Sequence, residues 1–228
     1  MKVGDLQAVL FDLDGVLTDT ASVHERAWGR LFSDVLVDPV APYTTTDYFA
    51  HIDGKPRHKG VRAVLESRGL DAPADYVDAL GKRKNAMFLA ELDEHGARVF
   101  PGAVALLNWL DHRATPKAVV SSSRNAEAVL RAAGLRQLID LVVDGNTALA
   151  RGIAGKPAPD TYLYAAHCLD ADPARAVVVE DATSGTRSGR AGGFHVIGVD
   201  RGAGVQALLG AGADVVVDEL DEVFAADR

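Results

Sequence analysis

The chain has 228 residues, of which 48% are hydrophobic, so it is long and apolar enough to bury a sizeable core, as one large domain or as a domain with an insertion. Its formal net charge of −8 argues against a nucleic-acid or anionic-membrane partner, because both require a basic surface. The single cysteine, Cys168, excludes an internal disulfide and fits a reducing compartment, and we interpret it as a small buried helix residue.

The start of the sequence lacks the pattern of a secretory signal, and no stretch approaches 18 uninterrupted apolar residues. We therefore expect a soluble, cytoplasmic protein with no membrane or nucleic-acid partner. We also expect it to be a monomer.

Along the chain, short apolar runs rich in β-branched residues alternate with segments of helical character. This alternation is typical of a doubly wound, Rossmann-like α/β core, in which helices cover both faces of a parallel sheet. Two core helices are predicted at Ala103–His112 and at Ala126–Ala133, where Asn125 can cap the start and Gly134 can end the helix. The predicted strands are Ala8–Phe11, Ala118–Val120, Leu141–Val143, Ala176–Val179, Val196–Val199 and Asp214–Val217.

Residues 21–96 interrupt this alternation, because they contain no comparable strand run and have the pattern of several helices. We predict a helical cap of residues 21–96, inserted after the first strand into an α/β core of residues 1–20 and 97–228. The chain crosses between the two parts near Asp19 and near Val99, and paired crossings are natural hinges. The helices predicted in the cap include Ser22–Leu36, Val61–Arg68 and Tyr76–Glu91.

The first strand is followed directly by two carboxylates, Asp12 and Asp14, and by the turn residue Gly15. In α/β proteins the carboxyl ends of the strands carry the chemistry. Two acids one residue apart can divide the labour of phosphoryl transfer. We assign Asp12 as the nucleophile that attacks phosphorus and Asp14 as the general acid and base.

Two further polar residues follow in an order that suits the same reaction. Ser121 comes directly after the second core strand, where its hydroxyl can hydrogen-bond a phosphoryl oxygen. Lys156 lies between Gly155 and Pro157, which keep it out of a helix. Its positive charge can neutralise the nucleophile and the transferring group, which the acids would otherwise repel.

Glu180 and Asp181 come directly after the predicted strand Ala176–Val179 and predict a site for a hard cation. Mg²⁺ is the expected ion because it retains waters and bridges carboxylate to phosphate. A calcium loop is disfavoured because its spaced acids are absent, and zinc is disfavoured because no histidine pair joins a cysteine at metal-ligand spacing.

These motifs together resemble those of the haloacid dehalogenase-type phosphotransferase superfamily. The four segments concerned are Asp12-Leu13-Asp14-Gly15, Val120-Ser121-Ser122-Ser123, Lys156-Pro157 and Glu180-Asp181-Ala182. Within it, the chain is most similar to the β-phosphoglucomutase-like branch, through His24, Ala27-Trp28, Arg57, Lys82-Arg83-Lys84-Asn85 and Ser123-Arg124-Asn125. The resemblance covers essentially the whole chain.

The resemblance implies Mg²⁺ held by Asp12, the backbone carbonyl of Asp14, and Asp181, with Glu180 in or next to that ligand set. It also implies a small phosphorylated sugar as substrate. Ser123, Arg124 and Asn125, with Arg57, would grip a distal phosphate. The cap residues His24, Trp28, Lys84 and Asn85 would contact the sugar or position the proton relay.

The chain departs from the glucose mutases at two cap positions. Asp53 stands where they carry a lysine, and Gly60 stands where they carry a serine. Two sugar contacts are therefore missing or rebuilt, with Lys55, His58 and Lys59 as possible replacements. The identity of the sugar stays open.

The leading hypothesis is a mutase that converts a sugar 1-phosphate into a 6-phosphate through a bisphosphate. A phosphosugar phosphatase would use the same core residues, with water as the phosphoryl acceptor. A sugar-phosphate-binding regulator is a more distant alternative, because a binder has no need of an acid and base beside a nucleophile. A dinucleotide-binding dehydrogenase is poorly supported, since no glycine fingerprint follows the first strand.

Overall fold

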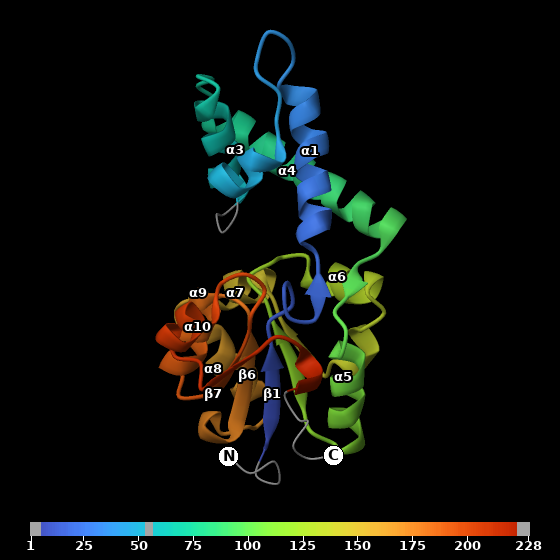
Figure 1. Ribbon diagram of the computed structural model, residues 1–228, viewed down its shortest axis with the longest axis vertical. Helices are drawn as coiled ribbons and strands as arrows, with labels where there is room; N and C mark the ends of the chain where they lie inside the picture. The colour runs from blue at the N-terminus through green and yellow to red at the C-terminus, as the bar shows by residue number, and fades with distance from the viewer. Residues whose placement is uncertain (1–5, 53–56, 223–228) are drawn as a thin grey trace. The chain divides into compact units, whose positions relative to one another are not determined.

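The structure is a computed structural model that describes residues 6–52 and 57–222. The described residues form two compact units (Figure 1). One is an α/β unit, made of the described residues of Met1–Asp19 and of Ala97–Arg228, and the other is a helical unit within Thr20–Gly96. We describe each unit by itself.

The centre of the α/β unit is a six-stranded parallel sheet in the order β5-β4-β1-β6-β7-β8. The first strand, β1, lies between β4 and β6, and all four of its residues are buried. The predicted parallel sheet is confirmed, because long apolar runs favour strands that are covered on both faces. The strands are β1 (Ala8–Phe11), β4 (Lys117–Val120), β5 (Leu141–Val143), β6 (Ala176–Glu180), β7 (His195–Val199) and β8 (Val215–Val217).

Helices cover both faces of this sheet, which confirms the doubly wound α/β architecture. In Figure 1, α5 and α6 lie on one side of the strands, and α8, α9 and α10 lie on the other. Right-handed crossovers between parallel strands require this division, because the chain moves outward from β1 in opposite directions in its two halves. The helices are α5 (Ala103–His112), α6 (Ala126–Ala132), η3 (Arg136–Leu138), α7 (Gly145–Arg151), α8 (Asp160–Cys168), η4 (Pro173–Arg175), α9 (Thr183–Ala191), α10 (Val205–Ala211) and η5 (Leu220–Glu222).

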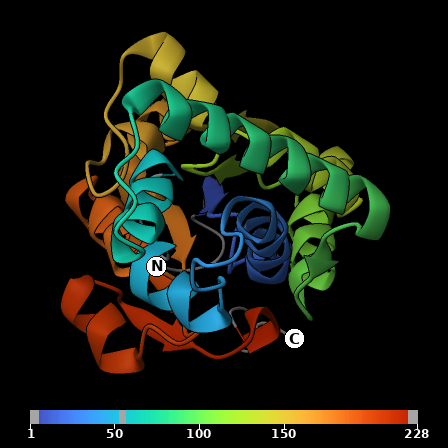
Figure 2. The same cartoon turned by 90° about the horizontal axis from the view of Figure 1, so that it is seen from above.

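The helical unit has its own apolar core. On α1 (Ala21–Val35), the buried residues recur at helical spacing and form one stripe that packs with residues of α3 and α4. Figure 2 shows α1 nearly end-on and α4 lengthwise, so the two helices cross steeply. The remaining helices are α2 (Thr45–Asp47), the π-helix η2 (Tyr48–Ile52), α3 (Arg57–Ser67) and α4 (Ala74–His95).

A second, two-stranded sheet was not predicted from the sequence. Its strands are β2 (Thr18–Asp19) and β3 (Arg98–Val99), which pair antiparallel with Thr18 opposite Val99. Strands of two residues are too short to show any periodicity, which explains why no sequence pattern indicated them. The pairing brings the two predicted crossings of the chain side by side.

Three local expectations require correction. Asn125 stands at the N-terminal cap position of α6 but makes no capping hydrogen bond through its side chain, because its backbone (φ −105°, ψ 10°) is not the extended conformation of a capping residue. Cys168 is exposed, because it lies off the buried stripe of α8 that carries Tyr162 and Ala166. Helix α3 begins at Arg57, four residues before the predicted start, since the polar run after Arg57 hides the helix.

Among the helices of the described residues, none combines the length and the apolar character that crossing a membrane requires.

Candidate active site

The sheet register brings the ends of three strands together. Phe11 of β1 pairs with Val119 of β4 and with Val179 of β6. Asp12 therefore leaves β1 beside the ends of both neighbours, and its N–H donates to the Val179 carbonyl (2.9 Å). Since parallel strands end at one edge of a sheet, the polar residues that follow these strands gather at that edge.

Lys156 connects all three of these strand ends. It lies in the turn between α7 and α8, outside any helix as predicted, and its side chain is only 7% exposed. Its Nζ donates to Asp12 Oδ1, to Glu180 Oε1 (2.7 Å) and to the Val120 carbonyl (2.8 Å). These three acceptors account for all three ammonium hydrogens, so the cation is held in one position between the two acids.

The carboxylate of Glu180 is buried, with its side chain 1% exposed, and it is held on both oxygens. Oε1 accepts from the Tyr162 hydroxyl (2.9 Å) as well as from Lys156, and Oε2 accepts from the Ala182 N–H (3.2 Å). A Cβ at Gly185 would stand 1.6 Å from Oε1, so only glycine leaves room for this carboxylate. Glu180 is therefore fixed in place, and it helps to hold the Lys156 ammonium in its position.

The loop after β1 approaches Asp181 closely. Gly15 has φ +92°, and a Cβ there would stand 2.0 Å from Asp181 Oδ2. Its N–H donates to the Thr18 carbonyl (2.8 Å), which closes the loop on itself. The absence of a side chain at Gly15 thus lets Asp181 reach the loop that carries Asp12 and Asp14.

The site holds more negative than positive charge. Burial raises the pKa of Asp12 well above its usual value; Lys156 opposes this, whereas Glu180, Asp181 and Asp14 add to it. Burial, followed by the charge of Glu180, likewise raises the pKa of Asp181 to about 7. For Lys156, burial lowers the pKa, but Asp12 and Glu180 together outweigh burial and hold it well above its usual value.

This excess of negative charge fits a divalent cation. Within residues 6–52 and 57–222, no three His, Cys, Asp or Glu side chains are arranged as a ligand set. Mg²⁺ does not require three such ligands, because it is usually bound through one or two carboxylates and retains several waters. Asp12 and Asp181, with a backbone carbonyl of the loop between them, are the donors of this type at the site.

The loop after β4 carries the next group of predicted residues. Ser121, which is buried, accepts a hydrogen bond on Oγ from the Ser123 N–H (3.0 Å), and Ser123 Oγ accepts from the Asn125 N–H (3.1 Å). These two bonds fold the loop into successive turns. Arg124 is exposed and Asn125 is buried.

The start of α7 holds this loop in place. The Gly145 N–H donates to the Ser123 carbonyl (3.0 Å), and the Asn146 side-chain amide donates to the Arg124 carbonyl (2.9 Å). Asp144 caps α7 by accepting from the N–H groups of Asn146 (3.1 Å) and of the residue after it. A Cβ at Gly145 would stand 2.7 Å from a backbone carbonyl oxygen of the loop. This support was not predicted.

In the helical unit, Lys84 is buried, at 2% exposure. Its Nζ lies 2.6 Å from His24 Nδ1 and stands over the rings of Trp28 (5.1 Å) and Phe88 (4.8 Å). Burial, then the charges of Lys84 and Arg57, lower the pKa of His24 to about 3. His24 is therefore neutral and accepts from the Lys84 ammonium.

The remaining cap predictions have mixed outcomes. Arg57 Nη2 donates to Asn85 Oδ1 (2.8 Å), so α3 and α4 bring these two predicted residues together. Trp28 is buried in the apolar core of the helical unit and stacks on Phe32 (5.6 Å). Gly60 is buried against Ile52. Asp53 and Lys55 lie outside the described residues.

The structure thus brings together Asp12, Lys156 and Glu180 directly, with Asp14 and Asp181 close enough to shift the pKa of Asp12. Their chemical roles stay predictions. Sequence reasoning missed Tyr162, Gly185 and the turn at Asp144–Asn146. An aromatic residue on an apolar helix face is usually core, so no signal in the sequence could have identified Tyr162.

Comparison with known proteins agrees with this geometry. A family model described as haloacid dehalogenase-like hydrolase matches residues 6–193. The chain is 43% identical to β-phosphoglucomutase of Mycobacterium tuberculosis, over 96% of this chain and 92% of that protein. It is 32% identical to hexitol phosphatase A of Escherichia coli, over 94% and 91%. The structure of β-phosphoglucomutase from Clostridium difficile superposes with a TM-score of 0.76 at 26% identity, over 96% and 93%.

Proposed function

Since the chain belongs to the haloacid dehalogenase-like hydrolase family, we propose that it transfers the phosphoryl group of a small phosphosugar through Asp12, as a β-phosphoglucomutase-like enzyme. The observation that supports this most is the position of Lys156, whose Nζ donates to both Asp12 and Glu180 at the carboxyl edge of the sheet. A carboxylate held against a fixed cation is aimed at one point, and the cation opposes the rise that burial causes in its pKa.

In the proposed reaction, a carboxylate oxygen of Asp12 attacks phosphorus and the bond from phosphorus to the leaving oxygen breaks. Asp14 gives its proton to that oxygen. It then takes the proton of the acceptor hydroxyl, which attacks the aspartyl phosphate and regenerates Asp12. Lys156 would offset the negative charge of the transferring group, and the Ser121 hydroxyl would donate to one of its oxygens.

Mg²⁺, held by Asp12, Asp181 and the carbonyl of Asp14, would supply positive charge against the phosphoryl oxygens. The raised pKa values of Asp12 and Asp181 support such a site, because like charges crowd there without enough counter-charge.

We assign the helical unit the role of a cap that selects the sugar and excludes water. Its two crossings at β2 and β3 are paired, so both chain segments can bend together as one hinge. Arg57, with Ser123, Arg124 and Asn125, would hold the distal phosphate, which lets a bisphosphate turn round and rebind.

A phosphosugar phosphatase is the second candidate, and the similarity to hexitol phosphatase A favours it. Water would then accept the phosphoryl group from Asp12. The core residues serve both reactions, so the products decide between them.

Phosphorus NMR of the purified protein with Mg²⁺, β-glucose 1-phosphate and a trace of glucose 1,6-bisphosphate tests the proposal. A 6-phosphate without inorganic phosphate is the expected result. Steady release of inorganic phosphate from this or another phosphosugar would make the enzyme a phosphatase. No turnover of any phosphosugar in a panel would contradict both.

The distal-phosphate role is tested with Arg57→Ala. We expect this variant to lose at least tenfold in kcat/KM on a bisphosphate, because a charge-assisted contact is removed, and to lose little on p-nitrophenyl phosphate. Arg62→Ala, on the same helix, is the matched control, since Arg62 donates to the Ala72 carbonyl (3.4 Å) and, among the described residues, to no acid. Equal losses of Arg57→Ala on both substrates would remove Arg57 from substrate binding.

A further inference from the structure

Arg201 stands two residues beyond β7, at the same edge of the sheet as the candidate active site. Gly198 of β7 pairs with Glu180 of β6, so the chain leaves β7 beside Asp181. The turn that carries Arg201 is fixed by Asp200, whose Oδ1 accepts from the N–H groups of Gly202 (2.9 Å) and Gly204 (3.0 Å). The side chain of Arg201 is only 17% exposed, which is low for an arginine.

The guanidinium of Arg201 binds three separate segments of the α/β unit. Nε donates to the Gly15 carbonyl (3.2 Å). Nη1 donates to the Asp218 carbonyl (2.9 Å), and Nη1 and Nη2 each lie 3.2 Å from one oxygen of Glu219. The flat face stacks on Phe100, with Cζ 3.9 Å from the ring centroid. A lysine has neither the planar face nor the fork that these contacts use.

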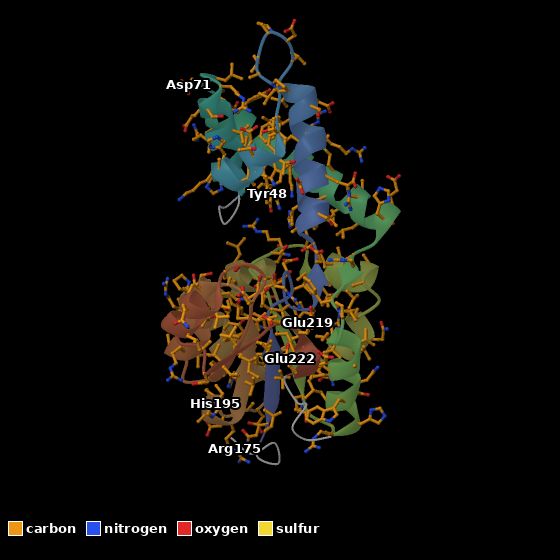
Figure 3. All side chains as sticks on the ribbon, viewed as in Figure 1. Tyr48, Asp71, Arg175, His195, Glu219 and Glu222 are labelled. Atoms are coloured by element: carbon orange, nitrogen blue, oxygen red, sulfur yellow. The ribbon has the colours of Figure 1, made fainter. Side chains whose placement is uncertain are left out.

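Each of these partners lies at a point that matters for the candidate site. Gly15 follows Asp14 in the loop that carries both proposed catalytic acids. Phe100 follows β3, the strand by which the chain returns from the helical unit, and its N–H donates to the Leu17 carbonyl (3.0 Å). Figure 3 labels Glu219 on the segment that follows β8, beside α5.

The contact with Gly15 fixes the backbone next to the proposed metal ligand. With the N–H of Gly15 bonded to Thr18 and its carbonyl bonded to Arg201, both polar groups of this residue are held. The Asp14 carbonyl belongs to the peptide whose N–H is that of Gly15, so its direction is set by the same bonds. A shift of Gly15 would also change its close approach to Asp181.

We infer that Arg201 is a positioning residue that aims the Asp14–Gly15 peptide at the metal and phosphoryl site, by bracing it against Phe100 and Glu219. Arg201 does not touch the reacting atoms. The inference rests on the proposed function and extends it to a residue outside the four motifs.

The test measures metal binding directly and in the absence of substrate. Mn²⁺ serves as the probe, and the loss of its free-ion EPR signal on binding gives the dissociation constant. Arg201→Gln and Arg201→Lys are compared with the wild type, and Asp181→Asn sets the baseline for a lost ligand. Steady-state kinetics on a phosphosugar, with Mg²⁺ at saturation, give kcat and KM separately.

Arg136→Gln is the matched control. Arg136, the first residue of η3, also binds a carboxylate and a backbone carbonyl, with Nε 3.1 and 3.0 Å from the two carboxylate oxygens of Glu127 and Nη1 donating to the Ile139 carbonyl (2.8 Å). It therefore reports the cost of losing a forked ion pair away from the site. We expect it to change thermal stability only.

We expect both Arg201 variants to bind Mn²⁺ about tenfold more weakly and to lose a similar factor in kcat, with KM within about twofold, as found for groups that orient metal ligands. Wild-type Mn²⁺ affinity and kcat in Arg201→Gln would overturn the inference. If the wild type binds no Mn²⁺ and turns over no phosphosugar, the proposed function fails first, and the inference fails with it.

Should Arg201→Gln not fold, Glu219→Gln tests the same brace more mildly. It retains the cation over Phe100 and weakens the forked pair. Mn²⁺ binding weaker than in the wild type, by a smaller factor than the roughly tenfold loss expected for Arg201→Gln, would support the inference, and an unchanged affinity would overturn it.

Discussion

Lys156 determines the charge arrangement of the candidate site. It faces Asp12 and Glu180 with all three of its hydrogens bonded, so it has no freedom to turn toward solvent. Its partner Glu180 is held in turn by Tyr162 and by the Ala182 N–H. The position of the proposed nucleophile thus depends on a chain of contacts that reaches into the core, where Tyr162 packs beside Phe194 (6.1 Å).

Tyr162→Phe tests this chain of contacts. Burial, then the charge of Glu180, raises the pKa of the Tyr162 hydroxyl, so it stays protonated and donates to the carboxylate. Removing the hydroxyl should lower the free energy of unfolding by about 2 kcal/mol, and kcat should fall because Lys156 loses part of its support. Urea unfolding and steady-state kinetics measure both. Tyr164→Phe, on the same helix, is the control, and identical behaviour of the two variants would contradict the account.

His24 gives the helical unit a predictable pH dependence. Its pKa is about 3 in the folded protein and about 6.5 when unfolded. Above pH 6.5 both states are neutral, so His24 has no effect. As the pH falls from 6.5 toward 3, only the unfolded state gains a proton, and stability falls by about 1.4 kcal/mol per pH unit.

The pH prediction is checked by urea unfolding of the wild type and of His24→Asn between pH 7 and pH 5, where the variant should show the smaller loss. Imidazole ¹⁵N shifts give the titration itself, with His24 assigned by its absence in the variant. A His24 imidazole that titrates above about pH 5 in the folded protein would contradict the prediction.

At the scale of elements, the turn that begins α7 supports the loop that carries the predicted phosphate-binding residues. Gly145→Ala should press a methyl group against the Ser122 carbonyl, 2.7 Å away, and against Arg124 Cγ, 3.0 Å away. We expect a loss of about 1–3 kcal/mol in stability and a higher KM for a bisphosphate, since the loop must move. Thermal unfolding and kinetics measure both effects.

Gly210→Ala is the control for this substitution, because a Cβ at Gly210 on α10 would meet no atom of the described residues within 4 Å. It should leave KM unchanged and stabilise the helix by up to about 1 kcal/mol. A Gly145→Ala variant that behaves like this control would show that the loop does not depend on α7.

The elements that could be predicted are those whose own sequence carries the signal. The apolar runs of β1 and β5 and the apolar face of α5 have the bounds that were predicted, because a short apolar run and a helical stripe are both visible in the local sequence. β2 and β3 could not be predicted, since a strand of two residues shows no sequence pattern and is recognised only by its pairing with the other strand.

The site follows the same rule. Asp12, Ser121 and Asp181 each come directly after a strand, so the parallel sheet alone brings them to one edge. Tyr162 contacts Glu180, 18 positions away in the sequence, and Arg201 contacts Gly15, 186 positions away. No local sequence pattern indicates contacts of this kind. Their importance became visible only with the fold.

At the scale of the whole molecule, we assign different parts of the proposed function to the α/β unit and to the helical unit. The first holds the proposed phosphoryl-transfer residues, and the second holds His24, Arg57, Lys84 and Asn85, which we assign to substrate selection. Antiparallel pairing of β2 with β3, joined by the Asp19–Arg98 ion pair, keeps the two chain crossings together. Changes at these four residues should alter KM and the acceptor, whereas changes at Asp12, Asp14 or Lys156 of the α/β unit should alter kcat.

Attack by Asp12 on phosphorus is the central claim, and turnover by Asp12→Asn tests it most directly. The amide has the size of the carboxylate but is a poor nucleophile, so the variant should unfold at a temperature close to that of the wild type and show less than about 1% of its turnover. Phosphorus NMR on the best phosphosugar, with Mg²⁺ present, measures both proteins in parallel. A folded Asp12→Asn variant that retains more than a few per cent of wild-type turnover would contradict the account.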